Sequence, residues 1–163
     1  MAIRQSLTRL PVKDLQRASS VSGEASLRMD RGGNTKVLFL CTGNSARSQM
    51  AEGLLRYIAG ERFEVASAGT KPAGLNPDAV AAMREIGIDI AHHRSKSVDE
   101  FLAQPFDYAI TVCDHARETC PVLPGAGRRL HWSLDDPAAV RGSDEERMAA
   151  FRRVRDALAE RIR

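Results

Sequence analysis

A strand-like and a helix-like pattern of hydrophobic residues alternate along the chain from about residue 36 onward. Short apolar runs, typical of strands that a parallel sheet buries on both faces, alternate with segments in which apolar residues recur at helical spacing. The apolar runs predict three strands, and we interpret a further segment as a fourth: Lys36–Leu40, Phe63–Ala68, Tyr108–Val112 and Arg129–Trp132. Strands that alternate with helices imply a parallel sheet with helices on both sides.

Helices are predicted between and after these strands by the spacing of their apolar residues. The first follows a turn-like loop after Cys41, the second is capped by Asn76-Pro77, and the last has an apolar face over Glu145–Ile162. A short helix is also expected at Val98–Leu102. We therefore expect an α/β fold, a three-layer α/β/α sandwich around a four-stranded parallel sheet.

Residues 1–35 differ from the rest of the chain because they are rich in Ser, Arg and Gly and show no sustained hydrophobic period. We expect a flexible, disordered N-terminal leader here, followed by one domain at residues 36–163. A short helix at Leu10–Arg17 and a start codon assigned too far upstream are alternatives for this segment. Its acidic residues speak against a targeting sequence.

The composition favours one globular domain, since the 163 residues are 43% hydrophobic and 28% charged. The net charge of +3 resides in residues 1–36, which hold 7 Lys/Arg and 3 Asp/Glu, whereas the other 127 residues hold 17 and 18. With an aromatic content of only 5%, this distribution speaks against nucleic-acid binding. No apolar run approaches the ~20 residues of a membrane span, and no secretory signal is present, so we expect the protein to stay in the cytoplasm. We also expect a monomer.

The loop from Cys41 to Ser48 places a cysteine, an arginine and a serine between a buried strand and a helix. Backbone N–H groups and the positive end of the helix dipole can wrap a tetrahedral oxyanion there. Gly43 permits a tight turn, and Arg47 can clamp the anion through two hydrogen bonds. The same field favours a Cys41 thiolate that accepts a hydrogen bond from Ser48. The expected oxyanion-binding residues are Thr42, Gly43, Asn44, Ser45, Ala46, Arg47 and Ser48. The alternative is a buried, inert Cys41 at a strand end.

The segment Val37–Glu52, VLFLCTGNSARSQMAE, resembles the phosphate-binding loop of the low-molecular-weight tyrosine phosphatase family, and the resemblance covers about residues 36–162. That family includes cysteine phosphatases and thioredoxin-linked arsenate reductases. The resemblance implies a parallel sheet flanked by helices, in agreement with the predicted order of elements. It also implies that Asp136, which directly precedes Pro137, is the general acid. A turn-forming Asp-Asp-Pro without chemistry is the alternative.

Two further cysteines follow the third predicted strand. Cys113 closes that strand at the same sheet edge as Cys41, so the two thiols can come within disulfide range. Cys120 lies seven residues later, about 10.5 Å away if the segment is helical, which is too far for a disulfide. Residues 114–119 must therefore bend or unwind if Cys113 and Cys120 pair. We expect this segment to have one reduced and one oxidised conformation.

By resemblance to the arsenate reductases of the family, Cys41 attacks arsenate, and Cys113 then attacks the sulfur of the Cys41 adduct and releases arsenite. Cys120 finally attacks Cys113 and forms a Cys113–Cys120 disulfide with it. Thioredoxin is then the electron donor that reduces the Cys113–Cys120 disulfide, and no bound cofactor is expected. Two alternatives for these cysteines stay open, namely an inert pair of buried thiols and a zinc site whose spacing is unfamiliar for structural zinc. The zinc ligands would be Cys113, His115 and Cys120 with His92 or His93. We expect no metal.

Several positions depart from the family pattern. Ala46 stands where some relatives carry a second loop cysteine. Certain reductases bind potassium beside this loop, but Lys96 lies in the segment that would complete such a site, and a lysine cannot ligate a cation. The small pair Ala138-Ala139 follows the Asp-Pro where family phosphatases have neighbouring tyrosines that recognise aryl phosphates.

Two polar segments outside the loop have plain interpretations. We interpret the basic run His92–Lys96 as a solvated turn, with a contact to a phosphate ester or a partner as a weaker alternative. We interpret His131 and Trp132 as side chains that fill the space under the Asp136 loop.

The leading functional hypothesis is a thioredoxin-coupled arsenate reductase that serves arsenic detoxification. The first alternative is a low-molecular-weight protein tyrosine phosphatase that acts through a Cys41 phosphocysteine with Asp136 as general acid. The second is an oxyanion-binding module or a phosphocarrier resembling the IIB subunits of sugar phosphotransferase systems. A phosphatase should keep its activity without Cys113 and Cys120, and this requirement separates it from the reductase.

Overall fold

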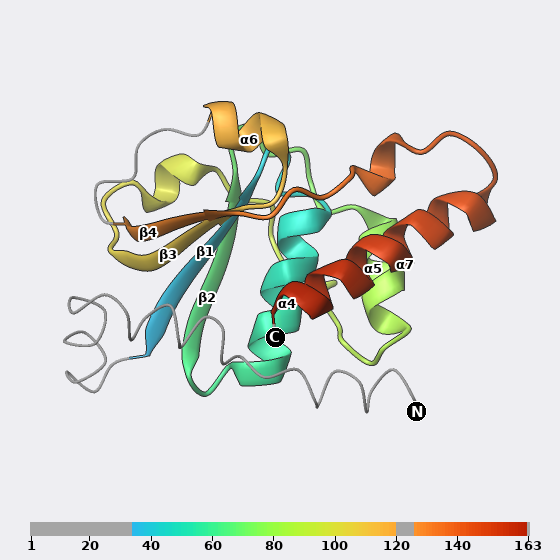
Figure 1. Cartoon of the computed structure of the whole chain (residues 1–163). Coiled ribbons are helices and arrows are strands. Elements are labelled where there is room, and N and C mark those ends of the chain that lie inside the picture. The colour runs from blue at the N-terminus through green and yellow to red at the C-terminus, as the bar shows by residue number, and fades with distance from the viewer. Residues whose placement is uncertain (1–33, 120–125, 163) are drawn as a thin grey trace.

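The structure, a computed structural model, describes residues 34–119 and 126–162 (Figure 1). Its strands are β1 (Thr35–Cys41), β2 (Phe63–Gly69), β3 (Phe106–Thr111) and β4 (Ala126–His131). Its α-helices are α4 (Arg47–Ala59), α5 (Pro77–Arg84), α6 (Asp114–Thr119) and α7 (Asp144–Arg161), and its 3-10 helices are η1 (Val98–Phe101) and η2 (Pro137–Ala139). The predicted leader and Cys120 lie outside the described residues, apart from the end of the leader at residues 34–35.

The predicted order of strands and helices is confirmed, with shifts at the ends of several elements. Strand β4 begins at Ala126 rather than at Arg129, because it is the edge strand and exposes Arg128 and Arg129 instead of carrying a continuous apolar run. Helix α6 was not predicted as an element, since its six residues are almost all polar. The cap at Asn76 is as predicted, and its side chain accepts hydrogen bonds from the backbone N–H groups of residues 78 and 79.

The four strands form one parallel sheet in the order β2-β1-β3-β4. Strand β1 lies between β2 and β3, so the chain leaves β1 toward one side and later returns to its other side. In a sheet of this kind, ligands bind outside the carboxyl ends of the strands at such a switch point. The register pairs Cys41 with Gly69 and Leu40 with Thr111, which brings the ends of all three strands to one edge.

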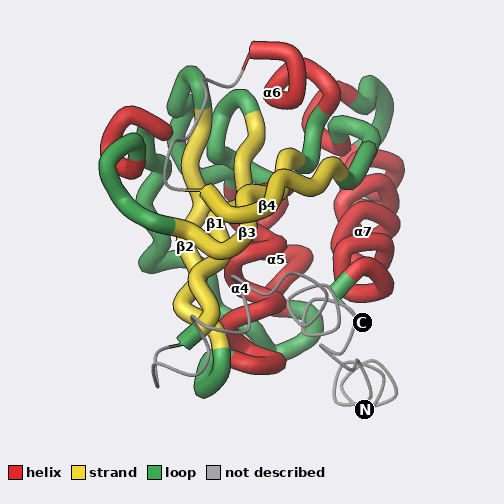
Figure 2. The backbone as a smooth tube through the Cα atoms, turned by 60° about the vertical axis from the view of Figure 1, so that its left-hand side comes forward, coloured by secondary structure: helices red, strands yellow, loops and turns green. Residues whose placement is uncertain are grey.

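Two hydrophobic clusters cover the two faces of the sheet. On one face α4, α5 and α7 pack against a core that includes Phe39, Leu54 and Phe151, and all three side chains are fully buried. On the other face η1 contributes Val98 to a smaller cluster around Leu38. Figures 1 and 2 show α6 beyond the end of the sheet, above the tips of the strands. The expected sandwich is confirmed, with a thinner layer on the η1 face.

Within residues 34–119 and 126–162, no helix combines the length and the apolar character that crossing a bilayer requires.

Candidate active site

The loop between β1 and α4 follows the end of the central strand and ends where Arg47 starts the helix. It packs directly on Gly69, the last residue of β2. A Cβ atom at Gly69 would lie 2.5 Å from the carbonyl oxygen of Thr42 and 2.7 Å from the backbone nitrogen of Asn44. Only glycine therefore lets the loop lie this close to the sheet.

Asn44 adopts the left-handed conformation in this loop, with φ of 46°. The sequence suggested Gly43 as the residue that permits the tight turn, and this assignment is wrong. Gly43 is not among the positive-φ glycines, and a Cβ there would make only ordinary contacts at 3.4 Å and beyond. Asparagine tolerates the left-handed region better than other side chains, because its short amide bonds locally.

The Asn44 side chain is fully buried and saturated with hydrogen bonds. Its Nδ2 donates to the hydroxyls of Ser48 (2.8 Å) and Ser67 (2.9 Å). Its Oδ1 accepts from Gln49 Nε2 at 2.9 Å and from the backbone N–H of Lys96 at 2.8 Å. These partners come from α4, β2 and the segment before η1, so three parts of the chain fix one strained residue.

Cys41 is only 3% exposed, and its sulfur has two hydrogen-bond partners. The backbone N–H of Asn44 donates to Sγ at 3.1 Å, and Ser48 Oγ lies 2.8 Å away. Because Ser48 Oγ already accepts from Asn44, its own hydrogen is available for the sulfur. Hydrogen bonds donated to the charged form stabilise a thiolate, so the arrangement suits a nucleophile.

Arg47 connects this loop to the segment after β4. Its Nη1 donates to the carbonyl oxygen of Leu134 at 2.9 Å, and its Nη2 lies 3.9 Å from Asp136 Oδ2. Asp136 caps η2 by accepting from the backbone N–H of Ala138 at 3.0 Å, and its side chain is 46% exposed. The predicted acid and the predicted anion clamp are thus neighbours at the rim of the loop.

Cys113 lies just beyond β3 and is 3% exposed. Its Sγ is 3.4 Å from Thr42 Oγ1 and accepts from the backbone N–H of Ala116 at 3.3 Å. The structure therefore brings a second buried thiol to the first residue of the loop after Cys41. The predicted third cysteine, Cys120, belongs to the undescribed segment 120–125.

A buried ionic cluster behind the loop was missed by sequence reasoning. Glu52 of α4 lies 2.9 Å from His93 Nδ1 and 3.8 Å from Lys96 Nζ, and the Glu52 and His93 side chains are each only 4% exposed. The interpretation of His92–Lys96 as a solvated turn is therefore wrong for these two basic residues. His93 Nδ1 also contacts Gln49 Oε1 at 2.9 Å, so the cluster reaches Asn44 through Gln49.

Opposing effects act on the charges of this cluster. Burial raises the pKa of Glu52, but the hydrogen bond from His93 and the positive charges of Lys96, His93 and Arg56 outweigh it, so the pKa is lowered overall. Burial lowers the pKa of Lys96, although Glu52 opposes this effect. The cluster therefore keeps a carboxylate charged behind the loop. His93 is engaged here, whereas one alternative placed it in a zinc site with Cys113.

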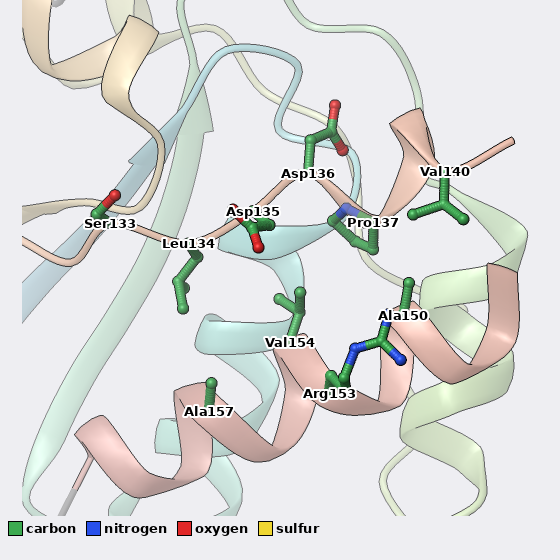
Figure 3. Close-up of a pocket in the computed structure, with 10 residues that line it drawn as sticks. All are labelled: Ser133, Leu134, Asp135, Asp136, Pro137, Val140, Ala150, Arg153, Val154 and Ala157. Atoms are coloured by element: carbon green, nitrogen blue, oxygen red, sulfur yellow. The ribbon is translucent and has the colours of Figure 1, made fainter. Parts of the chain in front are cut away.

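A cavity of about 310 Å³ lies beside the same rim, between the segment after β4 and α7 (Figure 3). Leu134, Pro137 and Val154 contribute apolar groups to its lining, and Asp135, Asp136 and Arg153 contribute charged ones. In Figure 3 the carboxylate of Asp136 points away from α7, whereas Arg153 extends from α7 toward the segment. The cavity is thus on the α7 side of Asp136 and separate from the cysteine loop.

Comparison with known proteins agrees with this geometry. Residues 36–163 match the family model described as low molecular weight phosphotyrosine protein phosphatase. The chain is 51% identical over 131 residues to an arsenate reductase of Halalkalibacterium halodurans, which covers 80% of this chain and 94% of that protein. It is 45% identical over 130 residues to an arsenate reductase of Bacillus subtilis, with the same two coverages, 80% and 94%.

Solved structures show the same relationship. An arsenate reductase in its oxidized state superposes with a TM-score of 0.68 at 32% identity and covers 78% of this chain and 93% of its own. A thioredoxin-dependent arsenate reductase of Corynebacterium glutamicum gives 0.58 at 29% identity over 86% of this chain and 72% of its own. A low molecular weight protein tyrosine phosphatase of T. tengcongensis gives 0.64 at 26% identity over 79% and 95%. With its cysteine loop, parallel sheet and relatives in agreement, the chain belongs to the low molecular weight phosphotyrosine protein phosphatase family.

Proposed function

We propose that this chain is an arsenate reductase that passes electrons from thioredoxin through Cys41, Cys113 and Cys120. The observation that carries the proposal is the buried Cys113 thiol, 3.4 Å from Thr42 at the start of the oxyanion loop. Hydrolysis of a phosphate ester needs one thiol, so a second thiol at this place has no task in a phosphatase. The similarity to curated arsenate reductases supports the same assignment.

In the first step the Cys41 thiolate attacks the arsenic of arsenate. A sulfur–arsenic bond forms and the bond from arsenic to its hydroxyl oxygen breaks, while that hydroxyl takes a proton from Asp136 and leaves as water. Arg47 and the backbone N–H groups of residues 42–48 hold the remaining oxygens. The 3.9 Å contact between Arg47 and Asp136 supports this division of roles, because the two side chains are close enough to act on one anion.

In the second step the Cys113 thiolate attacks the sulfur of the Cys41 adduct. A sulfur–sulfur bond forms, the sulfur–arsenic bond breaks, and its electron pair stays with arsenic, which is reduced from the +5 to the +3 state and leaves as arsenite. Cys120 then attacks Cys113, which frees Cys41 and leaves a Cys113–Cys120 disulfide. Reduced thioredoxin converts that disulfide back to two thiols and is itself oxidised. Thiols supply both electrons, so the cycle requires no bound cofactor, and the cytoplasm supplies the reductant.

The transfer to Cys120 requires α6 to open. An α-helix from residue 113 to residue 120 would separate the two Cα atoms by about 10.5 Å, beyond the ~6.8 Å limit for a disulfide. Helix α6 has only six residues, which favours such opening, since isolated short helices are marginal.

A phosphatase that forms a phosphocysteine on Cys41 is the second candidate, because Cys41, Arg47 and Asp136 would suffice for it. Exposed Ala138 and Ala139 follow Asp136-Pro137, and they provide no aromatic wall for an aryl phosphate. This feature favours a small inorganic anion as substrate.

The test is a coupled assay with arsenate, thioredoxin, thioredoxin reductase and NADPH. The parent protein should oxidise NADPH only when arsenate is present, and Cys41→Ser, Cys113→Ser and Cys120→Ser should each abolish the reaction. Asp136→Asn should lower the rate by about a hundredfold, the usual scale for a lost general acid. Hydrolysis of an aryl phosphate that needs Cys41 alone, with no arsenate-dependent oxidation, would transfer the assignment to a phosphatase.

A further inference from the structure

Polar side chains tie the first residue of α6 to the end of β4. Asp114 Oδ1 lies 2.8 Å from His131 Nε2 and accepts from Ser133 Oγ at 3.1 Å. His131 is the last residue of β4, and Ser133 follows it closely. The interpretation of His131 as a space-filling side chain is therefore incomplete, because its ring bonds directly to the helix that separates the two downstream cysteines.

The His131 ring is held from both nitrogens. A carboxylate can only accept, so Nε2 carries a hydrogen and donates it to Asp114. Nδ1 lies 2.7 Å from Thr111 Oγ1, at the end of β3. The His131 side chain is 17% exposed. Its orientation is thus fixed between β3 and α6, and it fixes Asp114 in turn.

The same turn of α6 positions the Cys113 sulfur. The backbone N–H of Ala116 donates to Cys113 Sγ at 3.3 Å, and Sγ lies 3.4 Å from Thr42 Oγ1. If the first turn of α6 moves, the N–H of Ala116 moves with it. The place of the sulfur beside the oxyanion loop therefore depends on the contact that anchors Asp114.

We propose that His131, acting through Asp114, is a positioning residue that holds the Cys113 sulfur for its attack on Cys41. The inference rests on the proposed function, since it concerns the step in which the Cys41–Cys113 bond forms and arsenite leaves. The contacts of Cys41 run to Asn44 and Ser48, whereas those of His131 run to Asp114 and Thr111. Loss of His131 should therefore slow this step and leave the reactivity of the loop unchanged.

The experiment uses the full chain with Cys120→Ser, so that the Cys41–Cys113 disulfide accumulates. Reduced protein is mixed with arsenate, quenched at intervals by alkylation, and analysed by mass spectrometry of its peptides. His131→Ala and Asp114→Ala should slow disulfide formation at saturating arsenate by about tenfold or more, because small displacements of reacting groups are costly. Asp114→Asn keeps the acceptor oxygen and should stay within about threefold of the parent.

Two controls separate positioning from general damage. Glu118→Ala removes another exposed carboxylate from α6 and should match the parent. The rate at which iodoacetamide alkylates Cys41, and the arsenate concentration that gives half the maximal rate, should be the same in all variants. Unchanged disulfide formation in His131→Ala and Asp114→Ala would overturn the inference, and so would an equal loss of Cys41 reactivity.

A parallel series with hydrogen peroxide keeps the inference separate from the proposed function. Peroxide oxidises Cys41 to a sulfenic acid, and Cys113 then attacks that sulfur and releases water. If the parent forms the disulfide with peroxide but not with arsenate, the reductase assignment fails, while the order of the variants still tests the role of His131. If neither oxidant yields the disulfide in the parent, Cys113 does not reach Cys41 and both proposals fail.

Discussion

The loop after β1 and the start of α6 each hold a cysteine sulfur, but they hold it in different ways. Around Cys41 the partners are buried, since Asn44 and Ser48 are both fully inaccessible to solvent. Beside Cys113 the anchor is a carboxylate, Asp114, whose side chain is 73% exposed. Exposed hydrogen bonds and ion pairs contribute less than buried ones, because water competes for them. Both sulfurs thus accept a buried backbone hydrogen bond, but the helix that holds the second is anchored through an exposed side chain.

The largest expected effect follows from disturbing the support beneath the rigid loop. Gly69→Ala would push a Cβ into the backbone of Thr42 and Asn44, so the loop must shift. We expect arsenate-dependent turnover to fall by about a hundredfold, because a misplacement of about 1 Å has effects of this size. Steady-state kinetics in the thioredoxin-coupled assay measure it.

Gly87→Ala is the control, since Gly87 lies outside the oxyanion loop and a Cβ there would meet no atom within 4 Å, although its φ of 81° favours glycine. It should change turnover by no more than about threefold. Equal losses in both variants would mean that the close approach at Gly69 is unimportant.

A second prediction concerns the buried amide within the loop. Asn44→Ala removes the hydrogen bonds to Ser48, Ser67 and Gln49 and leaves a left-handed backbone without a suitable side chain. The free energy of unfolding should fall by about 2–4 kcal/mol, measured by urea denaturation. Asn44→Gly relieves the backbone but also loses the hydrogen bonds, so it should recover only part of the loss. Full recovery by glycine would show that backbone strain, rather than the buried hydrogen bonds, governs this site.

A third prediction uses acid to weaken the cluster behind the loop. The folded-state pKa of Glu52 lies below the ordinary 4.5, so its stabilising contribution is present above about pH 4.5 and is lost as the pH falls through the folded pKa. Glu52→Gln should therefore be less stable than the parent near neutral pH, and the difference should shrink below about pH 4.5. Urea denaturation across this range gives the comparison. Glu64→Gln removes an exposed carboxylate, and its free energy of unfolding should stay close to that of the parent at every pH. If the free energy of unfolding of Glu52→Gln were lower than that of the parent by the same amount at every pH, the charge of Glu52 would not be the source of the stabilisation.

The smallest expected effect concerns the second region. If α6 opens when Cys113 and Cys120 pair, trypsin should cleave after Arg117 a few times faster in the oxidised protein than in the reduced one. The cleavage rate at Arg56, in the last turn of α4, serves as the internal control and should not depend on redox state. Equal cleavage rates after Arg117 in both states would contradict the expected opening of α6.

The sequence predicts the sheet and its large helices well because their signals are local. Apolar runs mark β1 and β3, and the Asn76-Pro77 cap marks the start of α5. Cys41 and Arg47 can be named because their types and spacing suit oxyanion chemistry, whereas Asp136 is named by the resemblance to the family. The structure places Arg47 beside Asp136. Their roles in turnover stay predictions until the variants are measured.

Other features depend on contacts between distant segments and leave no local pattern. The left-handed residue is Asn44 rather than Gly43, because Ser67, Gln49 and Lys96 converge on its amide. A basic run normally faces solvent, but His93 is buried because Glu52 of α4 lies directly against it. Helix α6 has too few apolar residues to be recognised from hydrophobic spacing.

The order of the strands has an evolutionary consequence. Strands β1 and β3 are neighbours, with Leu40 opposite Thr111 and the backbone N–H of Val112 donating to the Leu40 carbonyl at 2.8 Å. The sheet therefore holds the residue after Val112 beside Thr42 in the loop that follows Cys41, however long the intervening sequence becomes. In a protein of this topology, one codon change at the position after Val112 would therefore put a thiol beside the loop that follows β1. The backbone presents that position without any change in the sheet.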